Sequence, residues 1–343
     1  MRKLLNTLYI TSQGTYVHKE GETVVVEKDQ KKVLQLPIHT LQGLVCFGNV
    51  LCSPFLLGFC AERGITVTYL TENGRFLAAV NGPQNGNVLL RKEQYRRSDD
   101  AVASRNIAAP IVVAKITNAR TVLSRFLRDH SDRLTSDAVH KAVVTLSDIS
   151  KQVSSSEDID TIRGFEGQAA AVYFSVFNEL ILDQKEDFVF VARNRRPPLD
   201  PINAMLSFTY TLVTHDMRSA LETVGLDPAV GFLHRDRPGR PSLALDLIEE
   251  FRNSFADRLV LSIINRRQVS RKGFTFAENG AVSMDTETRK TLLVEYQTKK
   301  QQEVTHPFLG ETVPIGLLFF LQANLLARYL RGDLDGYPPF FWR

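Results

Sequence analysis

The chain has 343 residues, 43% of them hydrophobic, and a formal net charge of +4. This size and composition predict one large folded domain or two, with enough apolar side chains for a packed core. The small net charge excludes a histone-like polycation, so the distribution of charge along the chain is more informative than its total.

Cysteine usage and hydropathy indicate the cellular compartment. The three cysteines, Cys46, Cys52 and Cys60, have neither CxxC spacing nor a disulfide pattern, which is typical of a reducing cytosol. We recognise no secretion signal, and no apolar run reaches the ~18 residues needed to cross a bilayer. We therefore expect a cytoplasmic protein without a membrane segment.

Residues 1–80 predict a small β-rich domain, because apolar and polar residues alternate there between turn signals. Within this region we expect one helix over residues 54–63. An Asn73-Gly74 hairpin turn joins the last two expected strands. Residues 81–88, NGPQNGNV, have the composition of a linker.

From residue 89 onward, long helical patterns dominate, so residues 89–343 predict a larger all-helical catalytic domain. The expected fold class is therefore α+β, with the β-rich domain first. A loop is expected over residues 265–283, and the segment after Arg331 predicts an extended tail. The expected helices cover residues 89–98, 102–129, 135–153, 159–182, 200–224, 242–264, 284–301 and 313–331.

Four residues of the helical part are candidates for one site. Glu166 lies in RGFEGQAAAVYF, where its neighbours on the same helix face are small or apolar. His234 opens HRDRPGRPSLALDLIEEFR, which also carries Asp246 and Glu249. These two acidic residues are three positions apart and so share a helix face, where their charges repel unless a cation lies between them.

An imidazole and carboxylates brought together form a ligand set for a divalent cation. Oxygen ligands with open positions suit Mg²⁺ or Mn²⁺ acting on a phosphate, so we predict a metal site. The residues alone leave other interpretations open. Asp246 and Glu249 also fit a solvated helix face, His234 an ordinary loop histidine, and Glu166 a surface glutamate near a helix N-terminus.

Basic residues cluster around this candidate site, which predicts a polyanionic substrate because arginine's fork suits phosphate oxygens. No phosphate-binding GxxxxGK[ST] loop, GxSxG elbow, HExxH or groove-reading DNA motif is present in the sequence. The predicted DNA-binding residues among these clusters are Arg193, Arg196, Arg235, Arg237, Arg240, Arg266 and Arg267.

Taken together, four segments resemble the CRISPR-associated adaptation endonuclease, the integrase that inserts new spacers into CRISPR arrays. They are FGNVLCSPFLLGFCAERGITVTYLTENGRF, RGFEGQAAAVYF, RNRRPPLDPINAMLSFTYTLV and GFLHRDRPGRPSLALDLIEEFR. The pattern is similar to the variant found with type I systems, subtype I-C among them. The resemblance implies that Glu166, His234 and Glu249 bind the metal, that Asp246 supports it, and that Asn203 and Tyr210 line the DNA path.

The resemblance also implies an activity and an assembly. A 3′-hydroxyl of incoming DNA would attack a phosphodiester at the array, and water in its place would cleave DNA. The family forms homodimers, here through residues 1–80, and two dimers hold a dimer of a small ferredoxin-like partner protein. Two alternatives are a metal-dependent nuclease that only cleaves branched or single-stranded DNA or RNA, and a non-enzymatic DNA-binding scaffold.

Overall fold

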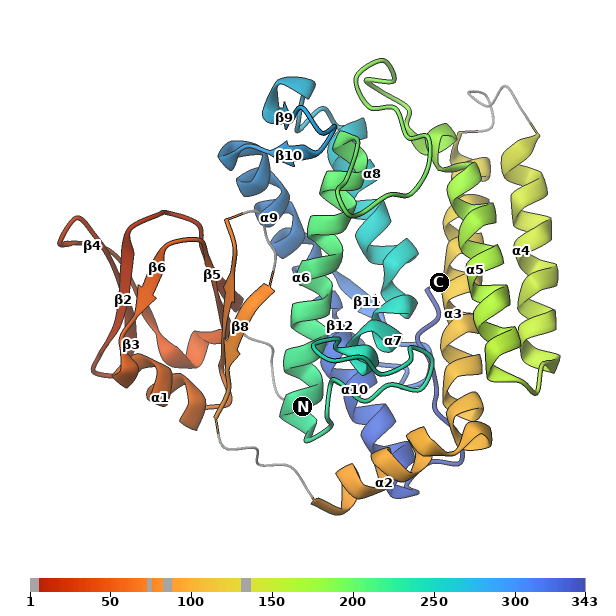
Figure 1. Ribbon diagram of the computed structural model, residues 1–343, viewed down its shortest axis with the longest axis horizontal. Helices are drawn as coiled ribbons and strands as arrows, with labels where there is room; N and C mark the ends of the chain where they lie inside the picture. The colour runs from red at the N-terminus through yellow and green to blue at the C-terminus, as the bar shows by residue number, and fades with distance from the viewer. Residues whose placement is uncertain (1–5, 73–75, 83–87, 131–136, 343) are drawn as a thin grey trace. The chain divides into compact units, whose positions relative to one another are not determined.

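The structure is a computed structural model that describes residues 6–72, 76–82, 88–130 and 137–342. The chain divides into two compact units, Met1–Asn85 and Gly86–Arg343. Figure 1 shows strands throughout the first unit and helices in most of the second, which confirms the α+β fold class. The predicted Asn73-Gly74 turn and most of the predicted linker lie outside the described residues.

The first unit contains two four-stranded sheets that share one core. The first sheet has the order β1 (Asn6–Ile10), β5 (Leu41–Phe47), β7 (Thr66–Leu70) and β8 (Phe76–Val80). The second sheet has the order β4 (Lys31–Pro37), β3 (Thr23–Lys28), β2 (Thr15–Glu20) and β6 (Val50–Cys52). The alternation along β2 and β3 has a direct cause, since Val17 is paired with Val26 and both are buried.

Helix α1 (Pro54–Glu62) contacts strands of both sheets. The Ser53 side chain accepts a hydrogen bond from the Leu56 amide, and Pro54 occupies the first turn, so the predicted helix start is confirmed. Leu56, Phe59 and Cys60 bury their side chains in the core of the unit.

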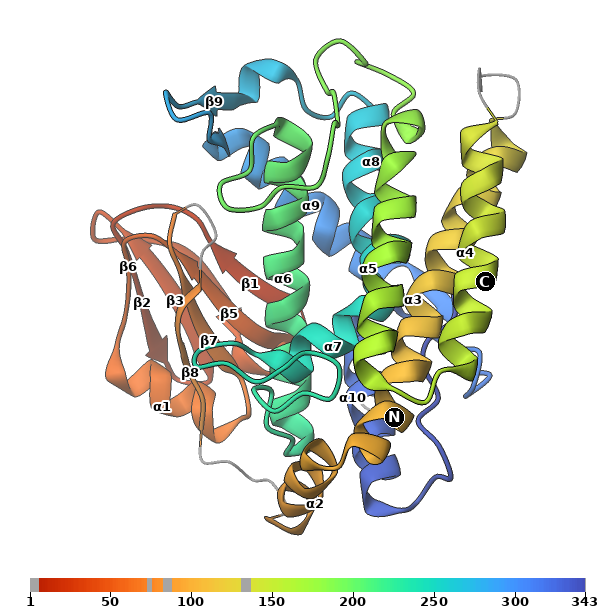
Figure 2. The same ribbon diagram turned by 45° about the vertical axis from the view of Figure 1, so that its right-hand side comes forward.

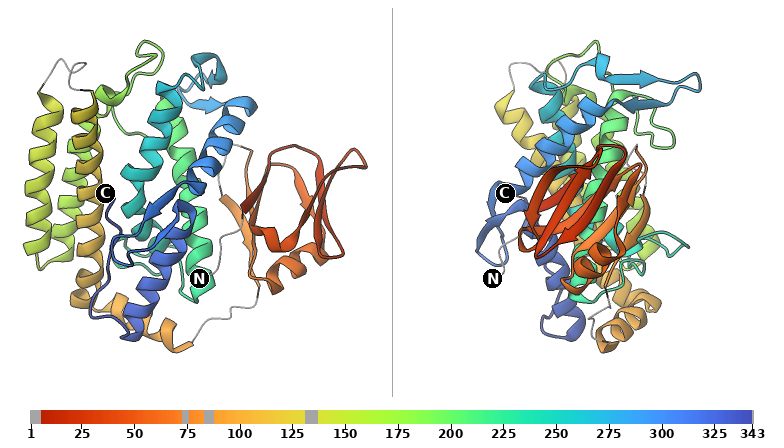
Figure 3. Two further views of the ribbon diagram at one scale, coloured as in Figure 1. Left: turned by 180° about the vertical axis from the view of Figure 1, so that it is seen from behind. Right: turned by 90° about the vertical axis from the view of Figure 1, so that its left-hand side faces the viewer.

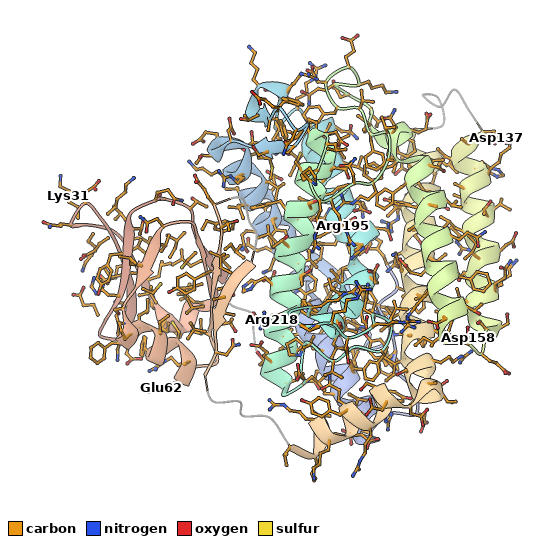
Figure 4. All side chains as sticks on the ribbon, viewed as in Figure 1. Lys31, Glu62, Asp137, Asp158, Arg195 and Arg218 are labelled. Carbon is orange, nitrogen blue, oxygen red and sulfur yellow. The ribbon has the colours of Figure 1, made fainter. Side chains whose placement is uncertain are left out.

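Three long helices of the second unit pack side by side: α3 (Ala101–Asp129), α4 (Ala138–Ser155) and α5 (Ile159–Ser175), as Figure 2 shows. Asp137 precedes α4 and Asp158 precedes α5, and Figure 4 places these two residues at opposite ends of the layer. The two helices are therefore antiparallel. The Asp158 carboxylate accepts from the Thr161 amide at 2.7 Å and caps α5.

The remaining helices surround the carboxylate-bearing segment predicted over residues 242–264. That segment is not one regular α-helix, because a π-helical turn, Arg252–Asp257, separates α7 (Ser242–Phe251) from α8 (Arg258–Asn265). The predicted helix over residues 159–182 likewise ends as a separate short turn, Phe177–Leu180. The other helices are α2 (Val88–Asp99), α6 (Pro201–Val224), α9 (Thr286–Gln301) and α10 (Ile315–Arg331).

The prediction that the second unit is entirely helical was wrong in two places. Strands β9 (Phe274–Phe276) and β10 (Val282–Met284) form a hairpin inside the predicted loop. A second pair, β11 (Glu303–Thr305) and β12 (Thr312–Pro314), precedes α10. Each strand is three residues long, which is too short for an alternating pattern to appear in the sequence.

The segment after α10 is extended, as predicted, but it is packed into the helical unit rather than free. Figure 3 shows this C-terminal segment beside α3. Phe340 is fully buried and stacks on Phe251 of α7 at a ring distance of 5.5 Å. Its amide donates to the Glu250 carboxylate at 2.7 Å, and its carbonyl accepts from the Asn118 side chain at 2.9 Å. The tail therefore packs against α7 and is hydrogen-bonded to it.

The buried imidazole of His215 on α6 predicts a loss of stability in mild acid. Burial lowers the pKa of His215 from 6.5 to about 4. Below about pH 6.5 the unfolded chain binds a proton that the folded chain does not, so the free energy of unfolding falls by about 3 kcal/mol by pH 4. We expect the unfolding temperature of His215→Gln to fall much less than that of the wild type between about pH 6.5 and about pH 4.

Exposed His140 provides the control for this measurement. The His140→Gln variant should follow the wild-type curve of unfolding temperature against pH. If His215→Gln and the wild type lose stability in parallel between about pH 6.5 and about pH 4, the buried histidine is not the cause.

No helix among the described residues is long and apolar enough to cross a membrane.

Candidate metal centre

The site is assembled from a loop and three helices, α3, α5 and α7. Glu166 projects from the middle of α5, and its side chain is 27% exposed. Glu249 projects from α7, and its side chain is 2% exposed. His234 comes from the loop that precedes α7, and its Nε2 lies 4.0 Å from Glu249 Oε1. The three predicted metal ligands therefore converge in space.

Asp246 shapes the loop that carries the histidine. It is fully buried on α7 and accepts hydrogen bonds from the amides of Phe232 at 2.6 Å, Leu233 at 2.9 Å and His234 at 2.9 Å. The same carboxylate lies 2.7 Å from His234 Nδ1. One buried carboxylate thus holds the backbone turn and orients the imidazole, so that Nε2 faces Glu249.

Glycine at position 231 is required for this close approach. A Cβ atom on Gly231 would lie 2.9 Å from Asp246 Oδ2 and 2.9 Å from the backbone of Ser242. Both atoms belong to buried residues of α7, so neither can move aside without disturbing the helix. The loop that begins the GFLH segment can therefore pack onto α7 only with glycine at this position.

Lys115 of α3 connects the two glutamates. It is only 6% exposed, its Nζ donates to Glu166 Oε1, and the same Nζ lies 2.7 Å from Glu249 Oε2. Burial alone would lower the pKa of Lys115, but the carboxylates of Glu249 and Glu166 raise it above its ordinary value. The lysine is therefore charged and neutralises carboxylates from two different helices.

Arg252 adds a second positive charge. Its guanidinium lies 3.2 Å from Glu249 Oε1 and 4.9 Å from the centre of the Tyr210 ring. Burial opposes ionisation of Glu249, but the charges of Arg252 and Lys115 outweigh it and lower the pKa of Glu249 to about 2. Glu249 is therefore a carboxylate throughout the physiological range.

The donor set suits a divalent cation, because two carboxylates and one imidazole nitrogen are ligands that Mg²⁺ and Mn²⁺ accept. At the present spacing, no three His, Cys, Asp or Glu side chains of the described chain form a group that could hold a metal ion. The ammonium of Lys115 sets that spacing, since it lies between the two carboxylates. The ligands fit the cation in kind, and they come from elements that meet at Lys115 and Glu249.

A cavity of about 450 Å³ adjoins the site. Residues of α3 and α5 line one side, and the other side comes from residues 191–193, from Tyr210 of α6 and from the π-helical turn. Three buried polar atoms of lining residues, the Tyr173 hydroxyl, Arg252 Nε and Asn253 Oδ1, have no hydrogen-bond partner among the described residues. The cavity offers space for part of a substrate next to the carboxylates.

Comparison with known proteins identifies the family. Residues 8–298 match the model of the family described as CRISPR associated protein Cas1.

The chain belongs to the Cas1 family.

Two relatives cover the whole of this Cas1 protein. The CRISPR-associated endonuclease Cas1 1 of Chlorobaculum tepidum is 54% identical over 343 residues, with 100% of each chain covered. The CRISPR-associated endonuclease Cas1 2 of Rhodospirillum rubrum is 52% identical over 347 residues, again with 100% of each chain covered. The resemblance seen in the sequence is thereby confirmed at the level of the family, and the type I-C variant stays a prediction.

Solved structures share the fold of this Cas1 protein at low sequence identity. A casposase bound to integration product is 22% identical, has a TM-score of 0.85, and matches over 99% of this chain and 95% of its own. A Cas1 protein from Thermotoga maritima is also 22% identical, with a TM-score of 0.81 over 97% of this chain and 99% of its own. A chain of a Cas6-RT-Cas1–Cas2 complex has a TM-score of 0.82 at 22% identity, over 98% of this chain and 36% of its own.

One of the predicted DNA-path residues of this Cas1 protein has a structural role. Asn203 is 0% exposed, and its side chain donates to the Ala192 carbonyl at 2.9 Å and accepts from the Arg193 guanidinium at 2.6 Å. Its amide holds the turn that leads into α6, and a place for Asn203 on a DNA path stays a prediction. Tyr210 and Arg193 do line the cavity beside the site.

The other predicted DNA-binding arginines lie in different surroundings. Arg235 is exposed and paired with Asp160 at 2.9 Å, and Arg267 is exposed and paired with Asp183 at 2.9 Å. A role in DNA binding stays a prediction for each of them. The exposed arginines of the set also include Arg196, Arg237 and Arg266, while Arg240 is half-buried.

Proposed function

We propose that this Cas1 protein is a metal-dependent DNA endonuclease and integrase that inserts DNA fragments into a CRISPR array by transesterification. The observation that carries the proposal is the convergence of Glu166, His234 and Glu249 from two helices and a loop. Relatives that cover the full chain carry the name CRISPR-associated endonuclease, which supports the nuclease part of the proposal.

Each residue of the site has a defined task in this proposal. Glu166, Glu249 and Nε2 of His234 would hold Mg²⁺ or Mn²⁺, and Asp246 keeps the imidazole turned so that Nε2 is available. When bound, the ion would supply electrostatic stabilisation of the charge that develops on the phosphoryl oxygens. Arg193 and Arg252, which line the neighbouring cavity, are placed to attract a DNA phosphate.

The proposed reaction exchanges one phosphodiester for another. The 3′-hydroxyl of the incoming fragment forms a new O–P bond, the existing O–P bond at the array breaks, and the departing 3′-oxygen takes up a proton. With water as the nucleophile the same exchange is hydrolysis, so cleavage should accompany joining. This route needs no covalent enzyme intermediate, and the site offers oxygen and nitrogen ligands rather than an activated nucleophile.

We also propose that the protein acts as a homodimer in complex with a small ferredoxin-like partner. The support is the family to which the chain belongs and the solved Cas6-RT-Cas1–Cas2 complex, one chain of which shares this fold. Residues 1–80 are the proposed dimerisation region.

A joining assay tests the proposed function. Labelled DNA fragments with free 3′-hydroxyls would be incubated with the protein, its partner and a supercoiled plasmid that carries a repeat array, in Mg²⁺ or Mn²⁺. We expect label to become covalently attached to the plasmid, and EDTA to abolish the attachment because the carboxylates alone cannot activate a phosphodiester.

The same assay separates the alternatives. Nicked plasmid without joined label would replace the integrase proposal with a nuclease that only cleaves. DNA binding that is indifferent to EDTA, with neither nicks nor joined products, would identify a non-enzymatic scaffold.

A further inference from the structure

Lys115 lies between the two glutamates of the proposed metal site. Its ammonium group joins Glu166 on α5 to Glu249 on α7, where the proposed function requires a divalent cation. We propose that Lys115 is a built-in competitor of the metal, so that metal binding displaces the lysine rather than adding to it. The inference rests on the metal-binding part of the proposed function.

Three of the four carboxylate oxygens of Glu166 and Glu249 already lie in contact with a cationic side chain. Lys115 Nζ lies 2.7 Å from Glu249 Oε2, and Arg252 lies 3.2 Å from Glu249 Oε1. Lys115 Nζ also donates a hydrogen bond to Glu166 Oε1. An ion that binds Glu166 Oε1 and Glu249 together therefore competes directly with these cationic groups. Lys115 is the group that contacts both glutamates, so its departure frees one oxygen on each.

Charge balance also favours displacement of Lys115 by the metal. Glu166 and Glu249 carry two negative charges, and the two basic side chains in contact with them, Lys115 and Arg252, already balance these charges. A divalent cation added beside both basic side chains would leave an excess of positive charge in a largely buried place, which is unfavourable. Withdrawal of the Lys115 ammonium reduces that excess as the ion enters.

The displaced ammonium has a place to go. Lys115 lines the cavity of about 450 Å³ beside the site. The Tyr173 hydroxyl and Asn253 Oδ1 belong to residues that line the same cavity, and both atoms lack a hydrogen-bond partner among the described residues. These oxygens can accept hydrogen bonds from an ammonium group, so the lysine need not be left without partners when it moves.

The test is metal affinity, measured without DNA and without turnover. Full-length wild type and Lys115→Gln would be titrated with Mn²⁺, and free Mn²⁺ would be followed by electron paramagnetic resonance. We expect the Kd for Mn²⁺ to fall about tenfold or more in Lys115→Gln, because a positive charge that repels the ion and occupies its ligands is gone. Lys115→Arg, which keeps the charge, should bind Mn²⁺ more weakly than Lys115→Gln.

Lys300 supplies the matched control. It is also a lysine with 6% exposure, and its Nζ is paired with the Asp216 carboxylate at 2.7 Å, away from the glutamates of the site. Lys300→Gln therefore removes a buried, paired ammonium of the same kind, and its Mn²⁺ affinity should equal that of the wild type.

A second measurement uses the wild type, in case Lys115→Gln does not fold. Reaction of lysine side chains with an amine-reactive reagent would be followed by mass spectrometry with and without saturating Mn²⁺. We expect Lys115 to become more reactive when Mn²⁺ is present, while Lys300 stays unchanged. Equal reactivity of Lys115 in the two conditions would overturn the inference.

The outcomes distinguish this inference from the proposed function. If the wild type binds Mn²⁺ and Lys115→Gln binds it equally or more weakly, Lys115 is not a competitor, and the proposed function still holds. If neither protein binds Mn²⁺ or Mg²⁺, the metal-dependent function fails and the inference fails with it.

Discussion

Replacement of His234 by alanine should abolish both joining and cleavage of DNA, while the fold and most of the DNA affinity remain. The side chain lies at the surface of the site, so its loss leaves no large cavity. It removes the one imidazole of the proposed ligand set. Loss of a partner outside the ligand set typically costs 10- to 100-fold, so loss of a ligand should lower the rate by more than about 100-fold.

The measurement is the joining assay with labelled fragments, run beside a DNA-binding assay and a thermal melt. Exposed His140 on α4 gives the control, since His140→Ala should retain wild-type rates. Persistence of joining and of branched-DNA cleavage in His234→Ala would show that the metal site has been assigned to the wrong residues.

Asp246→Ala should cause the largest loss of stability at the site. The carboxylate accepts three backbone hydrogen bonds, from residues 232–234, and it is fully buried. Each buried amide left without an acceptor costs about 1–3 kcal/mol, so the free energy of unfolding should fall by several kcal/mol. Asp246→Asn keeps one acceptor oxygen and should lose less.

Urea unfolding of both variants measures this difference. Asp148→Ala on the exposed face of α4 serves as the control, because its carboxylate only pairs with Lys151 at the surface. If Asp246→Ala unfolds at the same urea concentration as the wild type, the loop does not depend on this carboxylate, and the orientation of His234 must have another origin.

Much of this architecture could be predicted from the sequence because it follows from local patterns. Alternation predicted the β-rich first unit, and helical periodicity predicted most of the second. A metal site could be proposed because Glu166 lies among small and apolar residues and Asp246 and Glu249 share a helix face, and the family resemblance gave Glu166, His234 and Glu249 as its ligands. Their spacing could not show that Asp246 faces the backbone of the histidine loop instead of the same ion.

Lys115 was missed, although the sequence carries a signal for it. It is a single charged residue in the apolar run from Ile111 to Ile116, on a helix that was correctly predicted. A charge in such a run is costly to bury unless it is paired, so a carboxylate partner could have been inferred. Which carboxylate it meets depends on the packing of α3 against α5 and α7, and that packing has no local signature.

Other features that the sequence did not reveal have the same origin in tertiary structure. The family resemblance assigned Asn203 to the DNA path, and no pattern in the sequence showed that its amide completes the turn before α6. The hairpins β9–β10 and β11–β12 are held by pairing between short strands, which leaves no periodic pattern. In each case the deciding contacts join residues whose relation appears only after folding.

The packing of Phe340 against Phe251 and of its amide against Glu250 has a consequence for protein synthesis. The segment that bears Glu249 cannot reach its final support until the chain has been translated through Phe340, some ninety positions later. Domains generally fold as units, the N-terminal one first. The β-rich unit can therefore mature on the ribosome, while nuclease competence arises only when nearly all of this chain has emerged.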